Sequence, residues 1–411
     1  MNILLINQPL NNRGDESAHK GFVRRICEKV PSANIKVLFI GVNQKSIDQI
    51  KVYSTNVEYI NLESAKGYQS IVKYGLIYSL FPICKFFPII EKIITIYKYA
   101  DVVVCAPGGI CMGGFQNWEH LFLLKIAKSL KKPLIYYGRS FGPFPELTTA
   151  NRVFKKISFD MLHYFSFLSI RDKKTELLAD SLGLQYFSTV DSAFLDSPKV
   201  EIPKNVKMKI GEKKYMVFVP NLLIWHYAYK NKISKEIVID FFRSVISIIT
   251  NYYPDYNIIM LPQTFNFDNP GRGDINFFYD LTSDLKDPRI IILEDKYSSD
   301  LQQTVISNAE FLIGARYHSI VFAINNNVPF IALSYEHKIS GLLKSLGKEN
   351  CMVDITELSM NREQNLQLLE RVKDLLPKIH KDSVVREKAK NIAYDCFEKF
   401  LLFLKNEKLV K

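Results

Sequence analysis

The sequence has no apolar run long enough to cross a membrane. The longest apolar region, residues 74–99, is interrupted by Pro82, Pro88 and several charged side chains, among them Lys85, whereas a membrane-spanning helix needs about 20 consecutive, mostly apolar residues. The opening residues, MNILLINQPL, lack the basic start and extended apolar core of a secretion signal and are typical of a β-strand. We therefore expect a cytoplasmic protein.

Patterns of cysteine and histidine that hold metals or disulfides are also missing. The six cysteines form no CxxC pair and show no regular spacing, so we expect reduced thiols and neither a disulfide framework nor a zinc site. The seven histidines are scattered, without an HExxH element, and no paired DxD stands out. These absences predict a protein that works without a metal ion or another cofactor.

The formal net charge of +12 is not concentrated in an arginine-rich arm. It comes mostly from lysines spread along the chain, without zinc-finger spacing or the aromatic signature of RNA-binding modules, which argues against nucleic acid as a partner. The charge instead favours anionic substrates or an anionic membrane surface. Residues 66–99 interleave lysines with apolar and aromatic residues, as helices that lie on membranes do. Two interpretations of this segment stay open: peripheral contact with the inner face of the cell membrane, and an ordinary amphipathic cover of a sheet.

With 411 residues, the chain is too long for one compact core, and its pattern indicates two α/β domains. Short apolar strands alternate with helical patterns in both halves, which is typical of parallel, doubly wound sheets. The predicted domains are Rossmann-like and cover residues 1–197 and 215–380, joined by a polar linker over 198–214. A long helix within 381–411 is a candidate to pack back on the first domain. Two such domains that face each other over a cleft describe the GT-B class of glycosyltransferases.

Residues 311–347 contain the densest group of candidate site residues. An apolar strand that ends at Gly314 delivers Arg316 and His318 to the start of a helix, and a second strand delivers Lys338 to the start of the next helix. Parallel strands end on one edge of their sheet, and ligands of open α/β sheets bind at that edge. These cationic and titratable groups are therefore predicted to line a ligand site.

The first half offers further candidates where predicted strands end. Asn12 and Asp15 flank Gly14 at the start of a helix, where a glycine lets the backbone approach an anion. The turn 107–114 contains four glycines between a strand and a helix and suits a phosphate or a carboxylate. The other candidates in this half are Gly108, Gly109, Arg139, Ser140, Arg171 and Asp191. For the acidic residues, helix capping and turn formation are the alternative roles.

Six motifs follow one another along the chain from about residue 3 to residue 347. They are NNRGDE, APGG, GRSFGPF, SIRD, VDSAF and GARYHSIVFAINNNVPFIALSYEHKISGLL. Together they resemble the polysaccharide pyruvyl transferase family, and the GxRxH element is the most specific of them. One departure is Arg139, where the turn of the family more often carries glutamine, so an extra cation could bind donor phosphate or acceptor there.

The resemblance implies a GT-B-like fold and a transferase that uses phosphoenolpyruvate as its donor substrate. Such an enzyme places a pyruvate ketal on a sugar of a bacterial surface polysaccharide or of its lipid-linked precursor. The expected acceptor is a galactose-type or related sugar, with an undecaprenyl-linked form as one candidate. The carboxyl-terminal domain would take the donor and the amino-terminal domain the acceptor.

Ketal formation requires an acid, a base and cations for two anionic groups. His318 is the predicted proton carrier, with helix capping or core packing as its alternative role, and Asp15 and Asp191 are predicted to hold acceptor hydroxyls or to act as bases. Residues 225–227 are predicted either to stack on a sugar face or to form a core aromatic cluster. The predicted substrate-binding residues are Arg316, Arg171, Arg139, Lys338, Gly108, Gly109, Ser140 and Asn12.

Two other functions stay open on the sequence. A GT-B glycosyltransferase with a nucleotide-sugar donor would share the architecture, because a fold does not determine a function. A non-catalytic protein that binds or assembles polysaccharide is the second alternative, and it would not depend on His318.

Overall fold

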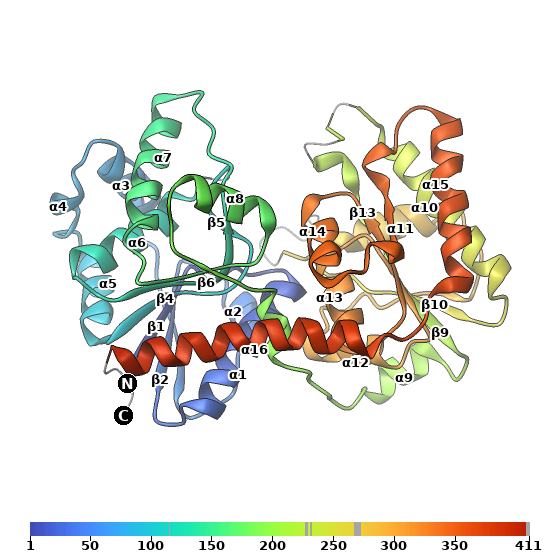
Figure 1. Cartoon of the computed structure of the whole chain (residues 1–411), viewed down its shortest axis with the longest axis horizontal. Coiled ribbons are helices and arrows are strands. Elements are labelled where there is room, and N and C mark those ends of the chain that lie inside the picture. Colours follow the sequence, from blue (N-terminus) through green and yellow to red (C-terminus); the bar gives the residue numbers. More distant parts are fainter. Residues whose placement is uncertain (115, 227–228, 231, 267–272, 408–411) are drawn as a thin grey trace. The chain divides into compact units, whose positions relative to one another are not determined.

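Two α/β units make up the protein, and each has its own parallel sheet (Figure 1). The computed structural model describes residues 1–411 apart from 115, 227–228, 231, 267–272 and 408–411. The first unit comprises residues 1–10, 15–196 and 392–411, and the second comprises residues 11–14 and 197–391. The predicted class of two Rossmann-like, doubly wound domains is confirmed.

The sheet of the first unit reverses its strand order beside β1. The order along the sheet is β3-β2-β1-β4-β6-β7-β8, and β5 pairs with β6. The strands are β1 (Asn2–Ile6), β2 (Asn34–Ile40), β3 (Val57–Leu62), β4 (Val102–Cys105), β5 (Ile110–Met112), β6 (Leu134–Phe141), β7 (Phe167–Ile170) and β8 (Phe187–Ser188). The reversal creates a switch point between β1 and β4, the place where open α/β sheets bind ligands.

Helices cover both faces of this first sheet. Successive side chains of a strand point to opposite faces, and those of β4 and β6 are all buried, so both faces need a cover. Tyr136 belongs to the core cluster that contains α6, whereas the ring of Tyr137 packs against Phe22 of α1 and Phe400 of α16. The helices associated with this unit are α1 (Arg13–Lys29), α2 (Gln44–Ile50), α3 (Tyr68–Ile77), α4 (Phe81–Cys84), α5 (Pro88–Tyr99), α6 (Trp118–Ser129), α7 (Thr149–Leu162), α8 (Lys173–Ser181) and α16 (Ser383–Asn406).

The second unit repeats the architecture with six parallel strands. Their order is β11-β10-β9-β12-β13-β14, with a switch point between β9 and β12. The strands are β9 (Tyr215–Val219), β10 (Asn257–Met260), β11 (Ile290–Ile292), β12 (Leu312–Gly314), β13 (Phe330–Ser334) and β14 (Met352–Asp354). The helices are α9 (Lys204–Ile210), α10 (Lys235–Tyr252), α11 (Asp274–Thr282), α12 (Ser299–Ser307), α13 (Tyr317–Asn325), α14 (His337–Leu346) and α15 (Arg362–Leu375).

The structure differs from the sequence-based prediction around the second predicted turn of the first unit. The sequence predicts Arg139 and Ser140 in a turn that follows a strand, but β6 continues to Phe141. The extension is stabilised by β5, which forms within the predicted glycine-rich turn and pairs with Ser140 and Phe141. Both site candidates therefore lie in a buried strand.

The segment 198–214, predicted as a linker, belongs to the second unit and contains α9. Val206 and Ile210 of this helix are buried. The side-chain amide of Asn257 donates to the carbonyl of Ile210 at 2.8 Å. The chain thus packs onto the second sheet soon after Asp196, because α9 has an apolar side.

The last helix, α16, completes the core of the first unit with aromatic side chains. The ring of Phe400 lies 5.5 Å from the ring of Phe22, 5.4 Å from that of Tyr137 and 5.9 Å from that of Phe167, measured between centroids. Phe400 is fully buried. Residues near the end of the sequence therefore cover one face of the first sheet, whose first strand starts at Asn2.

Replacing Phe400 by Ala is expected to lower the free energy of unfolding by about 3–5 kcal/mol, because it leaves a cavity among three aromatic rings. Urea denaturation followed by circular dichroism would measure the loss. Leu402→Ala on the same helix is the matched control, since Leu402 is 58% exposed and should change stability little. Equal stabilities of the two variants would contradict this account of α16.

Candidate functional site

Arg316 lies between β12 and α13 and is held by a buried acid. Its Nη2 forms an ion pair with Asp274 and donates to the hydroxyl of Thr264 at 3.1 Å. The Nε of the same guanidinium is buried and has no hydrogen-bond partner among the described residues. Asp274 thus orients Arg316, while one donor of the planar group is left for another acceptor.

Asp274 is itself fixed by the backbone at the end of β10. Its carboxylate accepts hydrogen bonds from the amides of Gln263 and Thr264, each at 2.9 Å, and from the Thr264 hydroxyl at 2.8 Å. Asp274 is not among the site residues that the sequence predicts, and residues 267–272 shortly before it lie outside the described residues. An acid directly before a helix, after a predicted strand end, was the signal that could have identified it.

His318 lies one residue inside α13, and Gly14 faces its ring. A Cβ atom placed on Gly14 would overlap the imidazole of His318, so only glycine allows the backbone at this position to approach the ring so closely. The imidazole is largely buried and packs edge-on against Tyr317, with centroids 4.9 Å apart. Its burial is compatible with both predicted roles, proton transfer and core packing.

Asn12 lies in a short segment that forms an isolated antiparallel bridge with Thr264, in the loop after β10. Residues 11–14 run beside 263–265: the Arg13 amide donates to the Gln263 carbonyl, and the Phe265 amide donates to the Asn11 carbonyl. The side-chain oxygen of Asn12 accepts from the Gly14 amide at 2.8 Å, which starts α1. This pairing brings Gly14 to His318 although the two are far apart in the sequence.

An aromatic group surrounds Tyr335, which follows β13. Its ring lies 5.2 Å from His226 and 6.3 Å from Trp225. Burial and the neighbouring Glu336 raise the pKa of Tyr335, and the positive charge of Arg316 opposes this rise. Trp225 is 54% exposed, so it is not a core residue, and sugar stacking stays a prediction. Tyr227, the third member of the predicted run, lies outside the described residues.

Lys338 is the second residue of α14 and lies beside Glu336, which directly precedes this helix. Its Nζ lies 3.7 Å from Glu336, and both side chains are mostly buried. The pair sits on the carboxyl side of β13, next to the strand that leads to Arg316. The predicted phosphate contact of Lys338 therefore competes with an internal ion pair and stays a prediction.

In the first unit, Asp15 lies against the glycine-rich turn. Gly108 has a positive φ of 151°, and a Cβ there would lie 2.5 Å from Pro9 and 3.3 Å from a carboxylate oxygen of Asp15. A Cβ on Gly109 would meet no atom within 4 Å among the residues that the structure describes. Gly108 thus permits a close approach of two loops at the β1–β4 switch point, and the anion contact predicted for this turn stays a prediction.

Arg139 stabilises the glycine-rich turn through hydrogen bonds to backbone carbonyls. Its Nε donates to the Gly109 carbonyl at 3.0 Å, and its Nη1 donates to the carbonyls of Asn7 at 2.6 Å and Ala106 at 2.9 Å. The side chain is 1% exposed. The enclosed cation thus links the residues that follow β1 and β4, which is a structural role. This role can be filled without any contact with substrate, and the predicted substrate contact of Arg139 stays a prediction.

Arg171 and Asp191 form a buried ion pair in the first unit. The other oxygen of Asp191 accepts from the Ala193 amide at 3.0 Å and caps a short 3₁₀ helix, Ser192–Leu195. Asp191 is fully buried, which matches the predicted alternative of capping. Ser140 is also buried. The catalytic and binding roles of these three residues stay predictions.

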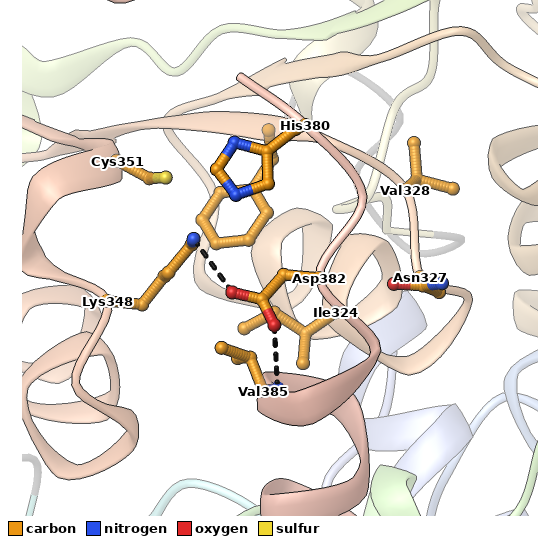
Figure 2. A pocket seen from close by; sticks show the side chains of 9 residues that line it. Ile324, Asn327, Val328, Lys348, Cys351, His380, Asp382 and Val385 are labelled. Carbon is orange, nitrogen blue, oxygen red and sulfur yellow. Dashed lines mark hydrogen bonds and ion pairs between the residues drawn. The ribbon is translucent and has the colours of Figure 1, made fainter. Parts of the chain in front are cut away.

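A small hollow in the second unit lies on the other edge of the sheet. It is lined by Lys348, His380, Asp382 and residues at the amino end of β13, such as Val328 (Figure 2). Lys348 pairs with Asp382 at 2.9 Å, and Asp382 accepts from the Val385 amide at 3.2 Å. Because Arg316 and His318 follow the carboxyl end of the parallel strand β12, this hollow is separate from them, and its ion pair anchors the start of α16.

The chain is similar to a protein family and to a curated relative. The family described as polysaccharide pyruvyl transferase matches residues 12–337. The chain is also similar to the amylovoran biosynthesis protein AmsJ of Erwinia amylovora, with 23% identity over 282 residues. That alignment covers 64% of this chain and 63% of AmsJ, so it spans less than two thirds of either protein.

Solved structures of other proteins have a similar fold. The UDP-GlcNAc 2-epimerase of Neisseria meningitidis, bound to UDP-GlcNAc, matches with a TM-score of 0.56 and 11% identity, covering 99% of this chain and 100% of its own. UGT89C1 of Arabidopsis thaliana matches with a TM-score of 0.53 and 11% identity, covering 97% and 98%. At these identities the likeness shows the fold, which is GT-B-like.

Replacing Gly14 by Ala is expected to lower the free energy of unfolding by about 1–3 kcal/mol, the usual cost of overpacking. The added methyl group would force the His318 ring or residues 11–14 to move. Gly341→Ala in α14 is the matched control, because nothing lies within 4 Å of a Cβ there, and it should be neutral or slightly stabilising. Chemical denaturation measures the free energy of unfolding of both variants. If Gly14→Ala were as stable as the wild-type protein, the close approach of Gly14 to the His318 ring would be refuted.

Proposed function

The chain belongs to the polysaccharide pyruvyl transferase family, and we propose that it forms a pyruvate ketal on a sugar of a bacterial surface polysaccharide. The donor in this proposal is phosphoenolpyruvate, and phosphate is released. The acceptor is a galactose-type or related sugar, free in the polysaccharide or carried by an undecaprenyl lipid. The similarity to an amylovoran biosynthesis protein supports a place in exopolysaccharide synthesis.

The proposed reaction needs one proton transfer to carbon and two attacks by oxygen. A proton adds to the vinyl carbon of phosphoenolpyruvate, which becomes a methyl group, and a sugar hydroxyl attacks the adjacent carbon and loses its proton. A second hydroxyl of the same sugar then attacks that carbon as the bond to phosphate breaks, and its proton leaves with phosphate or through a base. An acid, a base and anion-binding cations must therefore act together.

The observation that carries the proposal is the incomplete set of partners around Arg316. Asp274 engages only Nη2, and the buried Nε has no acceptor in the described part of the chain. A guanidinium held on one side by an acid can bind the planar carboxylate or the phosphate of the donor on its other side. In this proposal, the ion pair with Asp274 orients the guanidinium of Arg316 for binding phosphoenolpyruvate.

His318 is the proposed proton carrier because it follows Arg316 by two residues at the start of α13. An anion held by Arg316 would lie close to this imidazole, and histidine as a residue type can take or give a proton near neutral pH. Asp15, beside the glycine-rich turn, is the proposed partner for an acceptor hydroxyl. No metal ion is needed in this scheme, since arginine supplies the positive charge.

A GT-B glycosyltransferase with a nucleotide-sugar donor is the second candidate. Its support is the fold, since the neighbour from Neisseria meningitidis was solved with UDP-GlcNAc. The family match and the GxRxH element favour the ketal-forming reaction over this alternative.

The deciding experiment supplies the purified protein with phosphoenolpyruvate and a panel of lipid-linked galactosides. We expect release of phosphate and a product heavier by one pyruvate ketal, detected by mass spectrometry, with activity unchanged by a chelator. Parallel reactions receive UDP-sugars in place of phosphoenolpyruvate. Turnover with a nucleotide sugar only would overturn the proposal, and strict loss of activity with the chelator, restored by a divalent ion, would refute its metal independence.

Two variants separate donor binding from proton transfer in the same assay. Arg316→Ala should raise the KM for phosphoenolpyruvate by about 10–100-fold, the worth of one charged hydrogen bond. His318→Ala should lower kcat by about 10²–10⁴-fold with a small effect on KM. His163→Ala, an exposed histidine, is the control. Equal losses of kcat and KM at His318 would indicate that it only positions substrate.

Reaction in heavy water tests the first chemical step. If a proton adds to the vinyl carbon, the methyl group of the transferred pyruvate must contain solvent deuterium, which NMR or mass spectrometry detects. A product without deuterium in its methyl group would contradict protonation at carbon, whichever residue delivers the proton.

A further inference from the structure

The segment α3–α5 of the first unit has an inward face that belongs to the core. Side chains from all three helices, such as Tyr68, Cys84 and Ile90, are buried in the cluster that covers the first sheet. The segment is thus folded onto the unit, and α4 is a single turn between two longer helices (Figure 1). Pro82 and Pro88 stand at or near helix starts, where proline is tolerated.

The outward face of the same segment is apolar, which a simple cover of a sheet does not require. We call it the α4 patch: Tyr74, Tyr78, Leu80, Ile83, Phe86 and Phe87 are exposed large apolar side chains within residues 74–87. Phe86 is 86% exposed and Tyr78 is 64% exposed. Single exposed apolar residues are common on proteins, but a group of them in one segment is typical of a site that binds a protein or a membrane.

The charge around the α4 patch is positive. Residues 66–99 contain five lysines and one glutamate, a net charge of +4. Some lysines lie directly beside the aromatic rings: the Nζ of Lys85 is 5.7 Å from the Phe81 ring, and the Nζ of Lys73 is 5.9 Å from the Tyr74 ring. The patch therefore combines rings that can enter an apolar layer with cations that can stay at its rim.

We propose that the α4 patch docks the protein on the surface of an anionic phospholipid bilayer. Tyr and Phe at the tip would enter the boundary between head groups and acyl chains, while lysines contact the anionic head groups. The one-turn helix α4 lies at the outer edge of the first unit (Figure 1). A tip of this kind suits a flat bilayer better than a groove that encloses a peptide. None of the helices in the described residues is long and apolar enough to span a membrane, so the proposed binding is peripheral.

This inference does not depend on the proposed transferase activity. Binding to lipid can be measured with the purified full-length chain in the absence of any substrate. If the enzyme assay fails while vesicle binding succeeds, only the proposed reaction is refuted. The reverse result would refute the docking surface and leave the reaction standing.

The test is sedimentation of the protein with vesicles of phosphatidylcholine alone or with added phosphatidylglycerol, at low and high salt. We expect binding to the anionic vesicles, weaker binding at high salt because exposed charges are screened, and little binding to phosphatidylcholine. Removing one rim lysine by Lys85→Gln should weaken the binding about fivefold. The double variant Phe86→Ser with Tyr78→Ser should weaken it further.

Leu147→Ser is the matched control, because Leu147 is 91% exposed and lies outside the α4 patch. Thermal melts of all variants check folding, which should be unaffected at such exposed positions. A Phe86→Trp variant adds a direct readout, since its fluorescence should shift to shorter wavelength on anionic vesicles. The proposal would be overturned if the wild-type protein failed to bind anionic vesicles, as it would if the α4 patch bound a protein instead of lipid. Equal vesicle binding by the patch variants and the control would overturn it too.

Discussion

Parallel pairing of the strands is the constraint on which both groups of candidate site residues depend. Every recorded pairing within the two sheets is parallel, so the strand-to-helix turns of each sheet gather on one edge. Arg316 and Tyr335 meet there because β12 and β13 are neighbours. Asp15 and Gly108 meet for the same reason at the ends of β1 and β4. The hollow beside Lys348 lies on the other edge and is structural.

Burial of charge separates the predicted arginines into two kinds. A buried cation is costly unless hydrogen bonds and counter-charges surround it. Arg139 meets this condition with three backbone carbonyls, and Arg171 meets it with Asp191. The partners of Arg316 are incomplete in the described residues, since its Nε lacks an acceptor. The two arginines of the first unit are thus held by internal partners, and their predicted substrate contacts stay predictions. Arg316 in the second unit is the best candidate for binding an anion.

Much of the fold could be predicted from the sequence, because apolar strands that alternate with helical patterns are a local property. The strand that ends at Gly314 and the helix that starts near Arg316 were found from residue order alone. Arg139 and Ser140 were placed in a loop because β5, three residues long, has no local signal and forms only by pairing with β6. Asp274 was missed as a site residue because its function as an anchor comes from Arg316, 42 positions away.

The sequence by itself determined the fold class, the family and the positions of the GxRxH element and the glycine-rich turn, since composition, periodicity and motif order are carried by neighbouring residues. Only the tertiary structure decided that Gly14 faces His318, that Asp274 aims Arg316, and that Arg139 points into the protein. It also decided which face of α3–α5 is buried and which leaves Phe86 exposed. These relations arise when distant segments pack against one another, and no local pattern encodes which side chain will then find a partner.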